Sequence, residues 1–135
     1  MSDAGGFPHP VYAETVLAPL FEGVKRHHAV DMVRFNRAHL VMRAETGILS
    51  RDDAVRIAGA LRQIEAETDI AALTYDGAHE DYFFVVEHEL RRRLGDLGGA
   101  LHTARSRNDM DHTLFRMALR ERGARLMAQL AHLAE

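Results

Sequence analysis

The chain has 135 residues, a formal net charge of −3 and no cysteine. The net charge argues against a nucleic-acid partner, which normally requires a basic stripe, and the lack of cysteine excludes disulfides and thiolate chemistry. The N-terminus lacks the pattern of a signal peptide and the apolar runs are too short to cross a bilayer, so we expect a cytoplasmic protein without membrane partners.

The first part of the chain predicts helices. All three prolines lie before residue 20, and no alternating β-branched run indicates a strand. Residues 1–10 read as a loose arm, and residues 11–25 predict at most a weak helix that Pro19 interrupts. Residues 28–46 predict a helix that ends at Gly47. Its inward face should carry five apolar side chains, Val30, Val33, Leu40, Val41 and Ala44.

Two shorter helices follow. Residues 51–66 begin after Ser50, which forms a near capping box with Asp53. Their apolar positions follow helical spacing closely: Ala54, Ile57, Ala58, Leu61 and Ile64. Residues 81–94 predict the next helix, which opens on acidic residues and ends near Gly95. Its inward side chains should be Phe83, Val86, Leu90 and Leu94.

The last predicted helix spans residues 109–135 and follows a Gly-rich connection. Met110, Leu114 and Met117 share one stripe of it, and no helix-stopping signal marks its end at Glu135. A long helix with an apolar stripe needs partners to bury that stripe. We therefore expect the chain to be the N-terminal part of a larger all-α protein.

Three polar features favour ordinary structural roles. His79 and His88 do not fit the H-E-x-x-H spacing of zinc ligands, so we expect no metal site. The basic run "LRRRLG" at 90–95 shares its helix with acidic residues and predicts a self-paired, solvated face. The glycines of "GDLGG" follow a helix and lack the spacing of a phosphate loop, so we expect no cofactor.

The segment "HTARSRND" at 102–109 is the main candidate site. Asn108 or Asp109 makes a good N-cap, and a cap alone would explain the polarity. A helix N-terminus also offers free N–H groups and the positive end of its dipole. An Arg fork, a hydroxyl and an amide beside it would complete a carboxylate-binding cradle. The residues alone favour a capping loop and an anion site about equally.

The segment "GGALHTARSRNDMDHTLFRMALR" resembles the first signature of the argininosuccinate lyase family, G-K-L-H-T-G-R-S-R-N-D-Q followed by a long helix. The stretch "HEDYFFVVEHELRRRLG" is similar to the family's E-D-x-H segment, and "RAHLVMRAETGILSRDDAVRIAGAL" to its helix-turn-helix. The resemblance covers residues from about 34 to 122 in the family's order and spacing. The chain is thus identified as the N-terminal portion of a fumarase/aspartase-superfamily lyase.

The resemblance implies an all-α fold. Residues 1–107 would form the N-terminal helical domain, and residues 108–135 the first helix of the central helical domain. It also implies a carbon–nitrogen lyase, homotetrameric when complete, that eliminates fumarate from an N-substituted aspartate such as argininosuccinate and gives arginine. Ser106, Arg107 and Asn108 would bind the carboxylates of this dicarboxylate substrate.

Other family features bear on the same segment. By the resemblance, Thr103 and Arg105 shape the loop and Asp109 caps the following helix. The family's catalytic serine loop and its histidine partner lie beyond Glu135. We therefore assign no catalytic residue and expect the chain alone to be inactive.

The chain departs from the family pattern at three positions. Phe83 stands for a histidine, Ala104 for a glycine and Met110 for a glutamine. Phe83 leaves open a paralogous lyase for another N-succinyl compound, such as an aminopolycarboxylate of the ethylenediamine-disuccinate kind. A non-catalytic helical module, whose apolar stripe binds a partner helix, is the other alternative.

Overall fold

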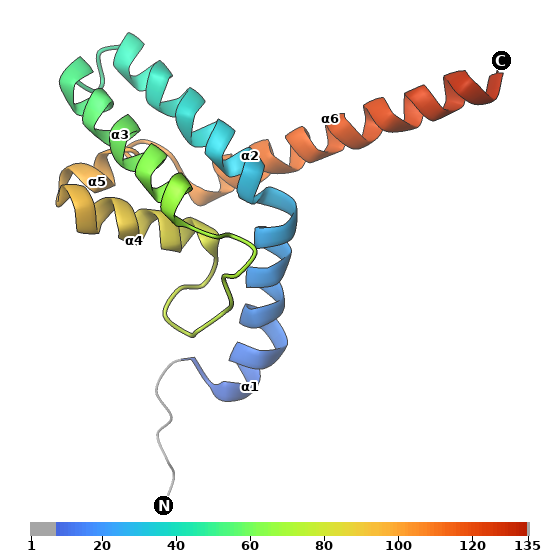
Figure 1. The fold of residues 1–135 in the computed structure, drawn as a ribbon, viewed down its shortest axis with the longest axis horizontal. Coiled ribbons are helices and arrows are strands. Elements are labelled where there is room, and N and C mark those ends of the chain that lie inside the picture. Colours follow the sequence, from blue (N-terminus) through green and yellow to red (C-terminus); the bar gives the residue numbers. More distant parts are fainter. Residues whose placement is uncertain (1–7, 135) are drawn as a thin grey trace, which may run out of the picture.

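The computed structural model describes residues 8–134, and every regular element in that range is helical. Figure 1 shows a hairpin of two helices covered by a third, with a last helix that leaves the body. The elements are α1 (Pro10–Tyr12), the π-helical turn η1 (Ala13–Leu17), α2 (Ala18–Glu45), α3 (Arg51–Glu67), α4 (Tyr82–Leu94), α5 (Leu97–Ala100) and α6 (Arg107–Ala134). The all-α prediction is confirmed. Residues 1–7 of the predicted arm and residue 135 of the predicted last helix lie outside the described range.

The N-terminal helix is longer than predicted, and Pro19 does not interrupt it. Helical structure runs without a break from Pro10 to Glu45, and its π turn lies just before Pro19. Proline has no N–H to donate, and its ring clashes with the carbonyl of the residue four positions earlier. In the π turn the Ala18 N–H bonds to the Ala13 carbonyl, five residues back. This wider turn accommodates the proline, so the predicted break was wrong.

The inward face of α2 is also different from the predicted one. Val30 and Val41 are 74% and 56% exposed, so their predicted burial was wrong. Leu40 is buried and Ala44 is partly buried against the core, as predicted. The other buried side chains of α2 are Phe21, Ala29, Met32, Asn36 and Arg43. Two of these, Asn36 and Arg43, are polar, and an apolar pattern cannot reveal a face that contains them.

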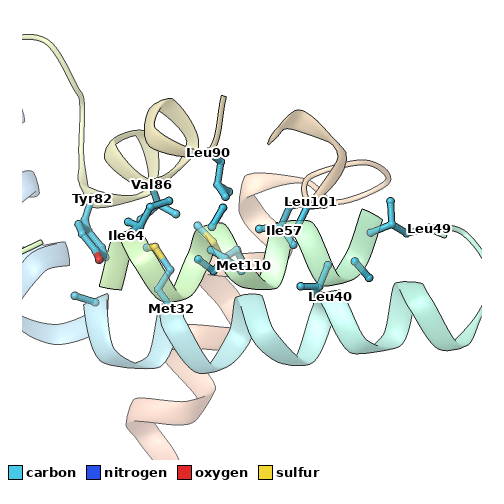
Figure 2. Close-up of a cluster of buried hydrophobic side chains, with 14 of the residues drawn as sticks. Met32, Leu40, Leu49, Ile57, Ile64, Tyr82, Val86, Leu90, Leu101 and Met110 are labelled. Atoms are coloured by element: carbon cyan, nitrogen blue, oxygen red, sulfur yellow. The ribbon is translucent and has the colours of Figure 1, made fainter. Parts of the chain in front are cut away.

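The core lies between α2, α3 and α4. Ser50 accepts a hydrogen bond from the Asp53 N–H (3.1 Å), as the near capping box predicted, and Ala54, Ile57, Leu61 and Ile64 of α3 are buried. Figure 2 shows Met32 of α2 and Ile64 of α3 near Tyr82 and Val86 of α4. Met110 lies in the middle of this cluster, and Leu101 lies beside Ile57.

A short helix, α5, occupies part of the predicted Gly-rich connection. Gly98 is buried, and a Cβ built on it would lie 2.5 Å from the carbonyl carbon and oxygen of Leu90. The glycine therefore lets α5 pack directly on the backbone of α4. Together, α4 and α5 set the position from which the chain enters the turn at 101–106.

The final helix, α6, begins at Arg107, two residues earlier than predicted. Met110 and Leu114 are buried in its first turns, where α6 packs against α2. Beyond them α6 runs away from the body (Figure 1). Its exposed apolar side chains are Phe115, Leu119, Leu126, Met127, Leu130 and Leu133. The division into domains at residues 107 and 108 stays a prediction, and no described helix is long and apolar enough to span a membrane.

The basic run at the end of α4 is paired, as predicted. Arg92 bonds to Glu89 (2.8 Å), and Arg93 contacts both Glu89 (3.2 Å) and Glu67 of α3 (2.7 Å). Hydrogen bonds to Arg92 and Arg93 lower the pKa of Glu89. These arginines therefore stabilise the α3–α4 pair instead of forming a free basic patch.

Candidate functional site

The N-terminus of α6 is closed by a reciprocal capping box. The hydroxyl of Ser106 accepts a hydrogen bond from the Asp109 N–H (3.2 Å), and the Asp109 carboxylate accepts one from the Ser106 N–H (2.9 Å). Hydrogen bonds from the backbone N–H of Ser106 and then from its side-chain hydroxyl lower the pKa of Asp109. Ser106 is therefore the N-cap, a correction to the prediction that Asn108 or Asp109 holds that position, while Asp109 is its partner in the first turn.

Several hydrogen-bond donors remain beside this cap. The Ser106 hydroxyl is not among them, because it accepts the Asp109 N–H and its own proton faces the Asp109 carboxylate. Asn108 is exposed, and its side-chain amide has no hydrogen bond within residues 8–134. The backbone N–H groups of Arg107 and Asn108 belong to the first turn, where no carbonyl of the same helix can accept them. The start of α6 thus presents donors to an anion.

Arg107, by contrast, already has two carboxylate partners. Its Nη2 binds the buried carboxylate of Asp81, and its Nε donates to Asp111 (2.9 Å). Its guanidinium also lies over the rings of Phe83 (4.9 Å) and Phe84 (5.8 Å). Burial lowers the pKa of Arg107, but the bonds to Asp81 and Asp111 outweigh burial and the net shift is upward.

Asp81 is the residue that local sequence reasoning missed. Its side chain is only 1% exposed, caps α4 by accepting the Phe83 N–H (2.8 Å), and binds Arg107. The sequence indicated an acidic helix start, but nothing local indicated that this carboxylate reaches Arg107. The Asp81–Arg107 pair joins the starts of α4 and α6 and so fixes where the donors of α6 point.

A second network holds the turn that leads to α6. Arg105 turns inward, donates to the amide oxygen of Asn36 (3.1 Å), bonds to His102 and stacks on Phe35. Burial, followed by the charge of Arg43, lowers the pKa of Arg105 to about 10. Its role is therefore to shape the loop, as expected.

Arg43 completes this network from α2. The side chain is buried, and its Nη1 donates to the carbonyls of Ala100 and Thr103 (3.3 Å for the latter). Ala104 next to them has a φ of +60°, a backbone conformation that glycine adopts far more readily. This is the position at which the family pattern has glycine, so the departure leaves the turn geometry in place at a cost in strain.

Phe83, another departure from the family pattern, lies between Arg107 and His102. Its ring contacts His102 edge to face (4.8 Å) and carries the Arg107 guanidinium on its surface. Burial, then the charges of Arg105 and neighbouring groups, lower the pKa of His102 to about 3. An aromatic ring here shields Arg107 from water and adds no hydrogen-bond donor or acceptor.

Comparison with known proteins identifies argininosuccinate lyases among the relatives of this chain. A protein of Agrobacterium fabrum named argininosuccinate lyase 2 is 54% identical over 122 residues, which are 90% of this chain and 24% of that protein. An argininosuccinate lyase of a Sulfurovum species is 41% identical over 95 residues, which are 70% of this chain and 20% of that protein. An argininosuccinate lyase of Streptococcus pneumoniae is 38% identical over 96 residues, which are 71% of this chain and 21% of that protein. The chain therefore spans about a quarter of the length of these relatives, and no family model or solved structure matches it.

Proposed function

The chain belongs with the argininosuccinate lyase family, and we propose that it forms part of a carbon–nitrogen lyase that eliminates fumarate from argininosuccinate and gives arginine. The names of the relatives favour argininosuccinate over other N-succinyl compounds. Such an enzyme would serve arginine biosynthesis in the cytoplasm.

The chemistry explains why donors at a helix start matter. A base removes a weakly acidic proton from the carbon beside one carboxylate, that carboxylate takes up negative charge, and the carbon–nitrogen bond then breaks. Preorganised donors aimed at the growing charge lower this barrier, and one such donor contributes roughly 10²–10³ in rate. The base and the acid of this reaction are not assigned to the chain.

The observation that carries the proposal is the set of unused donors at the start of α6. The exposed amide of Asn108 and the free N–H groups of the first turn belong to one helix end, and the Ser106 hydroxyl lies beside them, where a substrate carboxylate would compete with Asp109 for its proton. The positive end of the helix dipole adds to their attraction for a carboxylate. Ser106 and Asn108 would hold the substrate carboxylates.

Arg107 would act in two ways. Its bonds to Asp81 and Asp111 orient the first turn of α6, and its positive charge would attract the dicarboxylate. Its hydrogen bonds within the described residues use Nε and Nη2, which leaves Nη1 as the atom for a substrate oxygen.

We further propose that the complete protein is a homotetramer. The apolar side chains along the outer part of α6 are exposed on the described chain, and a long helix of this kind is buried by packing against other helices. Partner copies would supply such helices and would complete each active site.

A chimera tests the proposed reaction. Residues 1–135 would replace the matching segment of the Agrobacterium fabrum relative, and fumarate release from argininosuccinate would be measured for the chimera, the parent relative and the chain alone. The chimera should release fumarate and the chain alone should not. A folded chimera that releases no fumarate, while the parent relative does, would contradict the proposal.

A further inference from the structure

Arg43 is a buried arginine in the last turn of α2. Its side chain is only 3% exposed, and its Nε is buried without a hydrogen-bond partner in the described chain. A charged side chain loses its water shell on burial, which costs free energy unless other groups compensate. An apolar side chain would fill this inward position without that cost, so the bonds that Arg43 does make need an explanation.

The side-chain hydrogen bonds of Arg43 within residues 8–134 all end just before α6. Its Nη1 donates to the carbonyl of Ala100, the last residue of α5, and to the carbonyl of Thr103 (3.3 Å). The Ala100 carbonyl also accepts the Thr103 N–H (3.2 Å), so Arg43 contacts both ends of a tight turn. Arg43 therefore ties the end of α5 and the turn at 101–106 to α2.

Arg105 makes the reverse connection, from the turn to α2. It donates to Asn36 (3.1 Å) and stacks on Phe35 (4.9 Å). Burial lowers the pKa of Arg105, and so does the charge of Arg43, because two guanidinium groups repel each other. Hydrogen bonds from both arginines hold the turn on α2 against this repulsion.

The last residue of this turn is also the N-cap of α6. Ser106 and Asp109 form the capping box, and Asn108 lies in the helical turn that this box closes. Met110 and Leu114 hold the next part of α6 on α2, so a loosened turn would leave the body of α6 in place. It would displace Ser106 and let the first turn of α6 fray, which would move Asn108.

We propose that Arg43 is a positioning residue for the lyase reaction, and that it holds the turn at 101–106 so that Ser106 and Asn108 face the substrate carboxylate. This inference rests on the proposed function and adds a residue of α2 to it. Arg43 would act through the turn and not on the substrate, because its own side chain is buried.

The chimera tests this role through kcat/KM for argininosuccinate cleavage. Arg43→Met keeps the apolar length of the side chain and removes its donors and its charge. It should lower kcat/KM about tenfold, because a misplacement of about 1 Å costs up to about 10²-fold in rate. Arg43→Lys should restore most of the activity, since one nitrogen, Nη1, serves both carbonyls and an ammonium group has three protons to donate.

Arg34→Met is the matched control. Arg34 is an exposed arginine of the same helix, and it pairs with Asp31 within that helix (3.1 Å). The control variant should leave kcat/KM unchanged.

A second substitution separates positioning from a general structural role. In a chimera that already carries Asn108→Ala, the positioned amide is absent, so Arg43→Met should lower kcat/KM by no more than about threefold. A merely structural role of Arg43 predicts the same loss in both backgrounds, because effects at independent sites add.

Hydrogen exchange of the chimera, measured by mass spectrometry, follows the turn without any need for activity. Arg43→Met should speed the exchange of the amides at 101–106 about tenfold and leave that of α3 unchanged, because only the turn loses its bonds to α2. If Arg43→Met does not fold, Arg43→Gln replaces it in every assay. The amide of glutamine ends where Nε of arginine lies, so it does not reach the two carbonyls.

The outcomes distinguish this inference from the proposed reaction. Full activity of Arg43→Met, or an equal loss with and without Asn108→Ala, overturns the positioning role and leaves the reaction in place. A folded chimera that releases no fumarate contradicts the reaction, and the exchange measurement then decides the role of Arg43. Faster exchange at 101–106 in Arg43→Met supports its hold on the turn, and an unchanged rate overturns it.

Discussion

Neutralising Asp81 should detach the start of α6 from α4. Asp81→Asn keeps an amide oxygen that can accept the Phe83 N–H, so the cap of α4 survives, but it removes the charge that binds Arg107. Arg107 would then retain Asp111, whose side chain is 51% exposed, and the two phenylalanine rings.

The magnitude follows from the burial of the two partners. Removing one member of a fully buried pair costs about 3–5 kcal/mol. Asp81 is 1% exposed but Arg107 is 30% exposed, so water can solvate part of the released guanidinium. We expect Asp81→Asn to lower the free energy of unfolding by about 2–3 kcal/mol. Asp81→Ala should cost about 1 kcal/mol more, because the cap is lost as well.

Urea unfolding of the 135-residue chain, followed by far-ultraviolet circular dichroism, measures both values. Asp111→Asn is the matched control, since it removes the exposed partner of the same arginine and should cost less than about 1 kcal/mol. If Asp81→Asn costs no more than Asp111→Asn, the buried pair does not anchor α6 and the reasoning is refuted.

Three further predictions concern the neighbouring turn and use the same unfolding assay. Gly98→Ala should destabilise the chain by more than about 2 kcal/mol, because the new Cβ would clash with the Leu90 backbone. Gly99→Ala is the control and should be nearly neutral, because its Cβ would contact only the movable side chain of Arg91. Equal effects of the two variants would contradict the close packing of α5 on α4. Ala104→Gly should stabilise the chain by about 0.5–1 kcal/mol, since relief of the left-handed backbone outweighs the added entropy of the unfolded chain, and a loss of stability would disprove this. The pKa of His102 is about 3 in the folded chain and 6.5 in the unfolded chain, so between these pH values only the unfolded chain binds the proton. The contribution of His102 to the free energy of unfolding is therefore complete above pH 6.5 and falls as the pH drops, by up to about 1.4 kcal/mol per pH unit. His102→Gln should flatten this decline, and an unchanged pH dependence would show that the imidazole is not the titrating group.

The sequence predicted best where each inward position is apolar. In α3 the predicted residues Ala54, Ile57, Leu61 and Ile64 are buried, and Ala58 is partly buried against the core. In α2 the same reasoning correctly chose Leu40 but wrongly chose Val30 and Val41, because the polar residues Asn36 and Arg43 occupy inward positions. Their burial depends on Arg105 and on carbonyls of the distant turn, which an apolar pattern cannot reveal.

The candidate site, too, could be predicted only in part from local sequence patterns. The motif placed Ser106 and Asn108 at a helix start, where the structure has them, and their binding of a substrate stays a prediction. It did not reveal that Arg107 pairs with Asp81, 26 residues earlier, because a contact between the ends of two helices leaves no local periodic signal.

The central claim is that the start of α6 binds a substrate carboxylate. The most direct measurement is kcat/KM for argininosuccinate cleavage by the chimera with Asn108→Ala, beside its thermal unfolding midpoint. Asn108 makes no side-chain hydrogen bond within the described chain, so the midpoint should not change. Loss of a hydrogen bond to a charged group should cost about 1.5–3 kcal/mol of transition-state stabilisation, which lowers kcat/KM roughly 10- to 150-fold. Full activity in Asn108→Ala would mean that the motif only caps the helix.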